Sequence, residues 1–194
     1  MTSSSTTVRL VPFAHVATTG ALAAELAEAT LEWMESDAPW TLRIADFYEQ
    51  WELHLERATL PEPLSELLDA DFVEQLKLRL LGPIVAVDLE LVEVTAHKLL
   101  AGQTIRIHND YIEDAESHRI LIQLNRGWRD EQGGLLMLFG SSSSGDVQRV
   151  IRPIHRSAFG FSISDRSFHA VSTIAEGERY TLVYSFTFPK DPGA

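Results

Sequence analysis

Apolar residues in the first 80 positions recur every three or four residues, which is typical of helices that bury one face. The pattern predicts three helices, and Pro61 and Pro63 separate the second from the third. Gly82 follows the third, as glycine often does at a helix end. The predicted helices span residues 21–36 (with Thr18 or Thr19 as the cap), 44–57, and 65 or 69 to 81.

From residue 83 onward, apolar and polar positions alternate and β-branched and aromatic residues become frequent, which is typical of strands. Short strands after a helical lead predict an α+β, mainly β fold, namely a jelly roll with N-terminal buttressing helices. We expect a single domain over residues 1–194, with helical support in 1–82 and the β core in 83–190. The predicted strands span residues 84–94, 104–109, 119–125, 135–139, 149–153, 158–162 and 180–188.

The composition limits the classes of function. The 194 residues contain no cysteine, which excludes a disulfide scaffold, a thiolate zinc site, an iron–sulfur cluster and a cysteine nucleophile. A formal charge of −12 argues against a nucleic-acid partner. No apolar run reaches the roughly 20 residues that a membrane-spanning helix needs, and the first residues do not resemble a secretory signal. We therefore expect a cytoplasmic protein with no membrane partner.

One group of residues stands out as candidate chemistry. His108 and Asp110 lie two positions apart at the end of a predicted strand, so both side chains can point to the same side. His169 follows 59 positions after Asp110. Two imidazoles and one carboxylate form the set of ligands that binds non-haem Fe(II) and leaves coordination positions open. Arg179, ten positions after His169, could bind a small carboxylate ligand with both of its amino groups.

These motifs carry a resemblance to a known family. The segments KLLAGQTIRIHNDY, HRILIQLN, GGLLMLF and SFHAVSTIAEGERYTLVYSF resemble the double-stranded β-helix (a cupin-like jelly roll) of Fe(II)- and 2-oxoglutarate (2OG)-dependent oxygenases. The similarity covers roughly residues 96–188 and is greatest to the prolyl-4-hydroxylase-like branch, with its H-x-D, distal histidine and basic residue. The segments LLAGQTIRIHND and LIQLNRGW also resemble short bacterial oxygenases that accompany ribosomally made cyclophane peptides.

The resemblance implies a cofactor set and a reaction. It implies Fe(II) held by His108, Asp110 and His169, 2OG held by Arg179, dioxygen as oxidant, and ascorbate as a candidate reductant. Asp110 stands where related halogenases have a small residue, so hydroxylation is the expected outcome; desaturation and ring closure begin in the same way. The expected substrate is a side chain within a peptide.

Other residues are weaker candidates. Strand alternation places Arg106 and Thr104 on the side of His108, and a charged Arg106 would meet a carboxylate of cosubstrate, substrate or an internal acid. Prolyl hydroxylases often carry a tyrosine three residues before the metal histidine, where this chain has Ile105. The second cosubstrate contact is therefore open among three candidates, namely Arg106, Gln123 and Thr104.

Three further positions are candidates for contact with the substrate. Asn125 alternates with Gln123 on the next predicted strand, so both could line the pocket. Trp128 and Arg129 follow that strand and could form a pocket rim, although a core position for Trp128 is an equal alternative.

Two other functions remain open. The first is hydroxylation of a free amino acid or small natural product, which would need a closed pocket with charges for both ends of the molecule. The second is a non-catalytic jelly-roll binding module, with the histidines unused or holding a structural zinc; such zinc sites normally have four protein ligands, and three are evident here.

The acidic charge is uneven. Residues 1–80 contain 14 acidic and 5 basic residues, whereas the remainder contains 14 and 11. The expected β core is thus closer to neutral, and its arginines suit an anionic cosubstrate and an acidic peptide.

Overall fold

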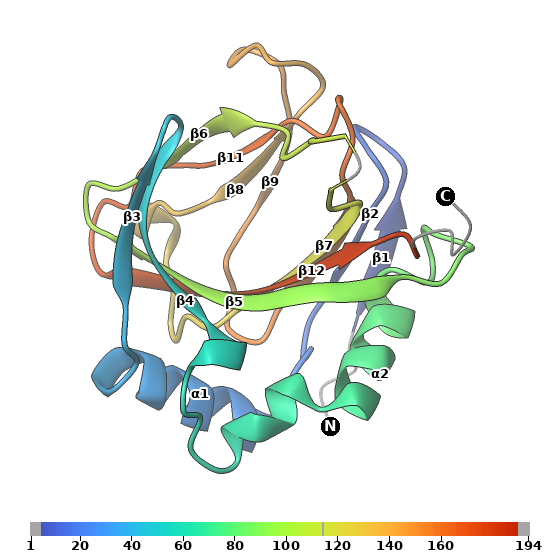
Figure 1. The fold of residues 1–194 in the computed structure, drawn as a ribbon. Helices are drawn as coiled ribbons and strands as arrows, with labels where there is room; N and C mark the ends of the chain where they lie inside the picture. Colours follow the sequence, from blue (N-terminus) through green and yellow to red (C-terminus); the bar gives the residue numbers. More distant parts are fainter. Residues whose placement is uncertain (1–4, 114, 190–194) are drawn as a thin grey trace.

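The computed structural model describes residues 5–113 and 115–189, and its strands form one antiparallel sheet. The strand order is β1-β2-β10-β7-β12-β5-β4-β6-β11-β8-β9, and β3 pairs with β4 beside this path. The sheet curls until the layer containing β5, β12 and β7 faces the layer containing β6, β11 and β8 (Figure 1). The strands are β1 Thr6–Arg9, β2 His15–Thr18, β3 Thr41–Ala45, β4 Tyr48–His54, β5 Glu90–Leu100, β6 Ile105–His108, β7 His118–Gln123, β8 Leu136–Phe139, β9 Val147–Ile151, β10 Ala158–Ser162, β11 His169–Val171 and β12 Glu178–Thr187.

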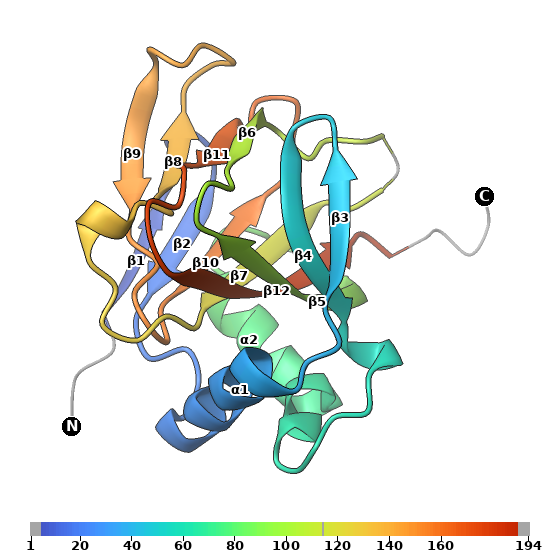
Figure 2. The same ribbon diagram turned by 90° about the vertical axis from the view of Figure 1, so that its left-hand side faces the viewer.

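Two helices, α1 (Ala24–Ser36) and α2 (Ala70–Leu80), lie beneath the outer face of the β5–β12 layer (Figure 2). Their buried faces pack against that layer in the larger of two hydrophobic cores, and the smaller core lies inside the curled sheet. None of the helices in the described ranges is long and apolar enough to span a lipid bilayer. The 3₁₀ helices span Leu55–Arg57, Leu64–Leu68 and Asp130–Gln132.

Strand β12 separates the helical core from the interior of the curled sheet. Because side chains alternate across a strand, its even-numbered residues pack into the core above the helices and its odd-numbered residues face inward. The two sets are Tyr180, Leu182, Tyr184 and Phe186 toward the helices, and Arg179, Thr181, Val183 and Ser185 toward the interior. One strand therefore provides both the core of the fold and one wall of a cavity.

The first and third predicted helices are confirmed. Helix α1 begins at Ala24 without a side-chain cap, so the predicted cap at Thr18 or Thr19 is wrong; Thr18 belongs to β2. Helix α2 begins after Asp69, whose carboxylate accepts hydrogen bonds from the backbone N–H groups of Asp71 (3.0 Å) and Phe72 (3.1 Å). A separate 3₁₀ turn precedes it.

The predicted helix over residues 44–57 is wrong. This segment is the β3–β4 hairpin with the short turn Asp46–Phe47, followed by a 3₁₀ turn. Strand β4 pairs with β5, from Trp51 opposite Lys98 to His54 opposite Thr95, and this pairing overrides the helical spacing of the apolar residues. The N-terminal part is therefore not simply a helical support, because it contributes four strands to the sheet.

The other strand predictions are largely confirmed, with three differences. The strand predicted at 84–94 is β5, which begins at Glu90 and continues to Leu100 because it pairs along almost the whole of β12. Strands β1 and β2 in the expected helical lead, and the short β11, were absent from the prediction. The predicted end of the β core at residue 190 lies outside the described residues.

Substitution of Gly160 tests the packing of α2 on β10. A Cβ atom at Gly160 would lie 2.7 Å from the carbonyl oxygen of Leu80, at the C-terminal end of α2. We expect Gly160→Val to lower the free energy of unfolding by about 1–3 kcal/mol, because the helix must move away from the strand. Gly145→Ala is the matched control, since a Cβ there meets only the Ser143 hydroxyl at 3.8 Å. Equal denaturant midpoints for wild type and Gly160→Val would contradict this packing.

Candidate metal centre and its cavity

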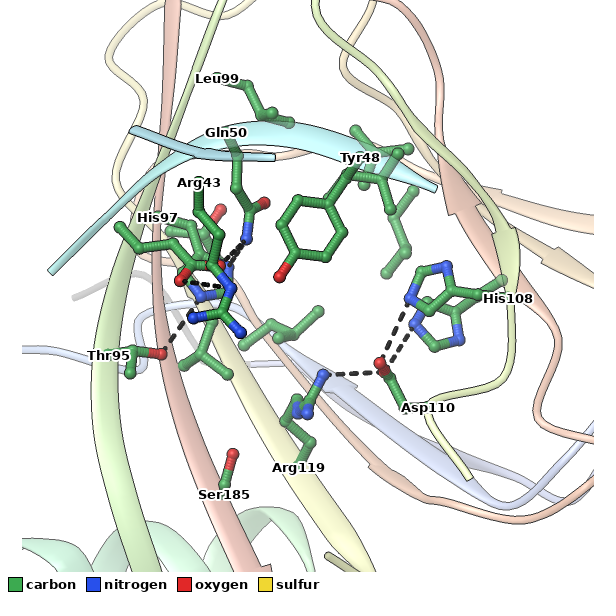
Figure 3. A pocket seen from close by; sticks show the side chains of 18 of the residues that line it. Arg43, Tyr48, Gln50, Thr95, His97, Leu99, His108, Asp110, Arg119 and Ser185 are labelled. Carbon is green, nitrogen blue, oxygen red and sulfur yellow. Dashed lines mark hydrogen bonds and ion pairs between the residues drawn. The ribbon is translucent and has the colours of Figure 1, made fainter. Parts of the chain in front are cut away.

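A cavity of about 360 Å³ lies between the two layers of the sheet. Strands β5, β7 and β12 line one side of it, and the β3–β4 hairpin contributes a further wall. Figure 3 shows His108 and Asp110 at one side and Gln50, Arg43 and His97 at the other, with Tyr48 and Arg119 between them. The apolar part of the lining consists of Phe47, Leu99, Ile105, Leu121, Leu136, Phe161, Val171 and Val183.

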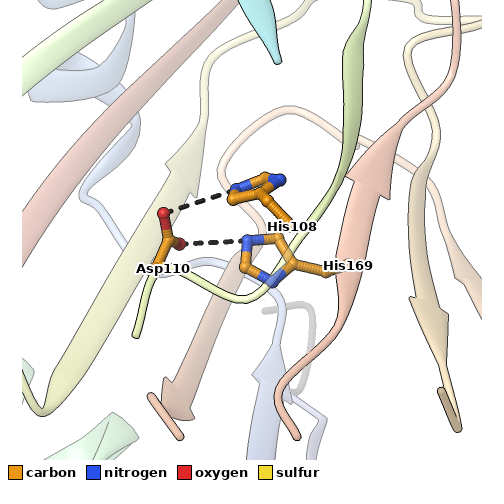
Figure 4. A group of neighbouring side chains, drawn as sticks. All are labelled: His108, Asp110 and His169. Carbon is orange, nitrogen blue, oxygen red and sulfur yellow. Dashed lines mark ion pairs between the residues drawn. The ribbon is translucent and has the colours of Figure 1, made fainter. Parts of the chain in front are cut away.

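The structure brings His108, Asp110 and His169 together at this wall (Figure 4). His108 ends β6 and His169 begins β11, and the two lie directly opposite each other in the antiparallel pair, with ring centroids 4.2 Å apart. Asp110 has a positive φ of 58°, and its carboxylate lies 3.4 Å from Nε2 of His108 and 3.1 Å from Nε2 of His169. Candidate ligand atoms of all three residues lie within 4.8 Å of one another, so one metal ion can contact them all.

Both imidazoles are fixed in the orientation that metal binding requires. Nδ1 of His108 lies 2.8 Å from the carbonyl oxygen of Arg106, and Nδ1 of His169 lies 2.7 Å from that of Ser167. These carbonyls can only accept, so each Nδ1 carries the proton and each Nε2 keeps a free lone pair toward Asp110. Phe47 also stacks on His108, with ring centroids 4.4 Å apart.

Arg119 on β7 holds the carboxylate of the group, and the sequence analysis missed it. Its Nη1 donates to Oδ2 of Asp110 at 2.8 Å, and its Nη2 donates to Glu116 at 2.5 Å. Burial alone would raise the pKa of Asp110, but the charge of Arg119 outweighs it and holds that pKa well below its usual range. The alternation that placed Gln123 on the inward face also placed Arg119 there, four residues earlier, and this was the available signal.

Arg179 is a buried cation whose hydrogen bonds are incomplete. Its side chain lines the cavity from β12, and Nη1 donates to the hydroxyl of Thr181 at 2.9 Å. That hydroxyl in turn donates to Oε1 of Gln123 at 3.1 Å. Nε and Nη2 of Arg179 have no partner within the described ranges, and burial lowers its pKa to about 10, which leaves it charged at neutral pH. Two free N–H groups on a buried guanidinium form a site suited to a carboxylate.

Comparisons with known proteins agree with this geometry. Residues 94–187 match the family model described as the 2OG-Fe(II) oxygenase superfamily, and this region contains the three metal ligands. Residues 94–187 of this chain are a 2OG-Fe(II) oxygenase core. Fe(II) and 2OG are therefore its implied cofactor and cosubstrate, and the residues fit both: three N and O ligands leave positions open, and the free N–H groups of Arg179 match a carboxylate.

Relatives of known structure share the fold of this oxygenase. A prolyl-4-hydroxylase from Pseudomonas putida superposes with a TM-score of 0.69, over 90% of this chain and 92% of that one, at 18% identity. A prolyl hydroxylase from Trichoplax adhaerens, in complex with a hypoxia inducible factor oxygen degradation domain peptide fragment, gives 0.68 over 89% and 82%, at 16% identity. Prolyl 3-hydroxylase sudestada1 of Drosophila melanogaster is 26% identical over 146 residues, which is 70% of this chain but only 26% of that protein.

The structure does not place Arg106 and Thr104 in the cavity of the oxygenase, so the predicted inward orientation is wrong. The register of β6 against β11 shifts between the pair His169–His108 and the pair Val171–Ile105, so β6 holds one extra residue. This bulge reverses the alternation, and Ile105 faces the cavity while Arg106 is exposed. The hydroxyl of Thr104 instead donates to the backbone oxygen of Val171 at 2.8 Å.

The other candidates also take structural positions. Gln123 lies behind Thr181 and reaches Arg179 only through that hydroxyl. Asn125 does not line the cavity, because its amide bonds to backbone groups of Pro153 and Tyr180. These bonds join the end of β7 to neighbouring segments, so Asn125 is a structural residue rather than a pocket residue.

Trp128 and Arg129 lie outside the cavity lining as well. Trp128 packs against the smaller core and donates from its indole N–H to the carbonyl of Gly133 at 2.9 Å. Its ring and the stem of Arg179 both pass close to Gly134, where a Cβ atom would lie 2.9 Å from Cδ of Arg179. Trp128 therefore helps to enclose the arginine rather than forming a rim. Arg129 is exposed and pairs with Glu176.

Tyr48 brings a tyrosine into the cavity beside Ile105, where the motif offered none. Ile105 replaces the expected tyrosine near the metal histidine, and the bridging partner of Ile105 across the sheet is Tyr48 of β4. The ring of Tyr48 projects into the cavity between the metal ligands and the hairpin wall (Figure 3). The sequence analysis could not find it, because it assigned this segment to a helix.

Removal of the carboxylate ligand tests the metal centre. We expect Asp110→Ala to weaken Mn(II) binding by at least about tenfold, because one of three ligands is lost and the charge of Arg119 is then balanced by Glu116 alone. Titration followed by electron paramagnetic resonance of free Mn(II) measures this. Asp165→Ala is the matched control, since that side chain is exposed and pairs only with its neighbour Arg166. Unchanged Mn(II) affinity in Asp110→Ala would disprove the ligand assignment.

Proposed function

We propose that this oxygenase hydroxylates an unactivated C–H bond on a side chain within a peptide, consuming 2OG and dioxygen. The observation that carries the proposal is the incompletely bonded guanidinium of Arg179 in the same cavity as the three metal ligands. A buried cation without an anionic partner is unfavourable, and a carboxylate held there would relieve it. 2OG has a carboxylate at each end, and one of them would pair with Arg179.

The residues of the chain divide the work. Fe(II) and 2OG, when bound, activate dioxygen, and 2OG is converted to succinate and carbon dioxide. His108, Asp110 and His169 hold the metal and leave positions open for ligands that are not protein. Arg119 holds the second oxygen of Asp110, so this carboxylate contacts the metal from a fixed orientation. Arg179, itself held by Thr181, fixes the far end of 2OG.

The apolar lining limits the access of water. Leu99, Leu121 and Val183 lie along the side of the cavity that Arg179 shares, and Phe161 packs against His169 with ring centroids 5.2 Å apart. These side chains cannot bind water through hydrogen bonds, so a bound cosubstrate meets a dry surface between its two ends. The wall formed by the β3–β4 hairpin would then position the reacting C–H bond of the substrate.

The choice of a peptide substrate rests on three lines of support. The fold matches that of the Trichoplax adhaerens enzyme that was solved with a peptide fragment. The curated relative is a prolyl 3-hydroxylase by name. The segments LLAGQTIRIHND and LIQLNRGW resemble oxygenases associated with ribosomal cyclophane peptides. A short precursor-peptide gene beside the gene for this chain would support the last point.

Substitution of Arg179 tests cosubstrate binding. We expect Arg179→Leu to raise the dissociation constant of 2OG at least about tenfold, because two charge-assisted hydrogen bonds are lost. Isothermal titration of 2OG into the Mn(II)-loaded protein measures this. Arg166→Leu, an exposed arginine that pairs only with Asp165, is the control. If Arg179→Leu bound 2OG as wild type does, another residue would have to hold the cosubstrate.

The reaction itself is tested with Fe(II), 2OG and ascorbate. We expect succinate to form, and mass spectrometry of a peptide substrate to show a gain of one oxygen atom on a side chain. If free amino acids gain an oxygen atom and peptides do not, the alternative small-molecule function is the correct one. If the protein neither forms succinate nor binds 2OG, a non-catalytic binding module is the better description.

A further inference from the structure

A second polar group faces the cavity from the β3–β4 hairpin and the neighbouring β5. Glu52 of β4 lies opposite His97 of β5 in the sheet, so both side chains point to the same face, together with Gln50 and Thr95 two positions away. Figure 3 shows Gln50, His97 and Thr95 across the cavity from His108 and Asp110. The proposed cosubstrate positions do not use this group.

The hydrogen bonds of Gln50 fix which way its amide points. Its Nε2 donates to Oε1 of Glu52 at 2.8 Å, and a carboxylate can only accept, so the nitrogen must lie on this side. Nε2 also lies 3.4 Å from Nδ1 of His97. The amide oxygen, Oε1, is buried and has no hydrogen-bond partner within residues 5–113 and 115–189. Gln50 is only 3% exposed, so bulk water does not reach this acceptor to donate a hydrogen bond to it.

His97 supports this arrangement as a neutral side chain. Burial, with the nearby charges of Arg119 and Arg179, lowers its pKa to about 3. The amide N–H of Gln50 faces Nδ1, so Nε2 carries the proton and donates to the hydroxyl of Thr95 at 3.2 Å. The imidazole therefore holds Gln50 in place without adding a positive charge to this side of the cavity.

The charges on this wall are mainly acidic. Glu52 and Glu93 face the cavity, and Glu93 lies 3.2 Å from the imidazole of His54. The side chain of Glu52 is 16% exposed, and its Oε2 lies 3.6 Å from Nε of Arg43, a distance too long for a hydrogen bond. The side chain of Arg43 is 62% exposed and can swing into solvent. The acid is thus the fixed member of this pair, and the arginine is the one that can leave.

We propose that Gln50 and Glu52 form a substrate subsite for a positively charged nitrogen group, best matched by the guanidinium of an arginine residue. This rests on the proposed function of the chain as a peptide hydroxylase. Oε1 of Gln50 and Oε2 of Glu52 offer two acceptors, and a guanidinium presents several N–H donors in one plane. Arg43, whose guanidinium lies beside Glu52 in the structure, is displaced when the substrate binds.

The same contacts disfavour an acidic side chain at this wall. A carboxylate would meet Glu52 and the amide oxygen of Gln50, both of which repel it. The other arginines of the cavity are engaged, since Arg119 is paired with Asp110 and Glu116 and Arg179 is assigned to the cosubstrate. The expectation of an acidic peptide, drawn from the overall number of arginines, therefore does not hold at this subsite.

The test compares three probe peptides, acetyl-Gly-Xaa-Gly-amide with arginine, citrulline or glutamate as Xaa. Citrulline has nearly the shape of arginine without its charge. Dissociation constants are measured by nuclear magnetic resonance titration on the full chain, loaded with Zn(II) and 2OG to prevent turnover. We expect the arginine probe to bind at least about tenfold more tightly than the citrulline and glutamate probes.

Two substitutions should act in opposite directions. Glu52→Gln removes the charge with little change of shape, and we expect it to abolish the preference for arginine over citrulline. Arg43→Gln removes the competing guanidinium, and we expect it to tighten binding of the arginine probe. Glu49→Gln on the same strand is the matched control, because Glu49 is exposed and bonds to Gln103 at 3.0 Å outside the cavity.

Equal binding of arginine and citrulline probes to the wild-type protein would overturn the proposal without any variant. Preferred binding of the glutamate probe, weakened by Arg43→Gln, would overturn it and assign Arg43 to an acidic substrate. Succinate formation by wild-type protein in the absence of any probe tests the oxygenase function separately. Failure of that function and failure of the subsite therefore give different results.

Discussion

The site depends on one strand that is buried on both faces. Strand β12 is hydrogen-bonded on one edge to β5 and on the other to β7, so it can neither slip nor rotate without breaking both pairings. The helices fix it from below through Tyr180, Leu182, Tyr184 and Phe186. A shift of one residue would exchange this apolar set for Arg179 and Thr181, which would place a charge in the core. The core thus fixes the position of the cavity arginine to within a single register.

The two buried arginines of this cavity differ in their hydrogen-bond partners, and this difference indicates their different roles. Arg119 has acidic partners within the chain, and through Asp110 it orients the metal ligands. Among residues 5–113 and 115–189, Arg179 hydrogen-bonds only to the hydroxyl of Thr181, and its stem packs close to Gly134, beside Trp128. A cation enclosed this closely is stabilised by an anion, which is the role we propose for a carboxylate of 2OG.

The sequence could predict the metal ligands because their positions follow from chain order and local geometry. His108 ends β6, Asp110 follows it by two residues just outside the strand, and His169 and Arg179 lie at or near the starts of β11 and β12. The sequence could not predict that Arg106 and Thr104 lie outside the cavity, since one inserted residue in β6 reverses the alternation and leaves no mark in the composition. Arg119 could be predicted from the same alternation, because it lies four residues before Gln123 on the inward side of β7.

The hairpin is where prediction from sequence failed and where we propose the substrate subsite. Residues 44–57 have apolar positions at helical spacing, and only pairing with β5 makes them strands, which is a contact distant in sequence. That pairing turns Tyr48, Gln50 and Glu52 toward the metal side of the sheet. The metal ligands therefore follow from spacing along the chain, whereas the wall that carries the proposed substrate subsite is set by tertiary register. On this proposal, changes in the hairpin alter the substrate while leaving the metal and cosubstrate residues in place.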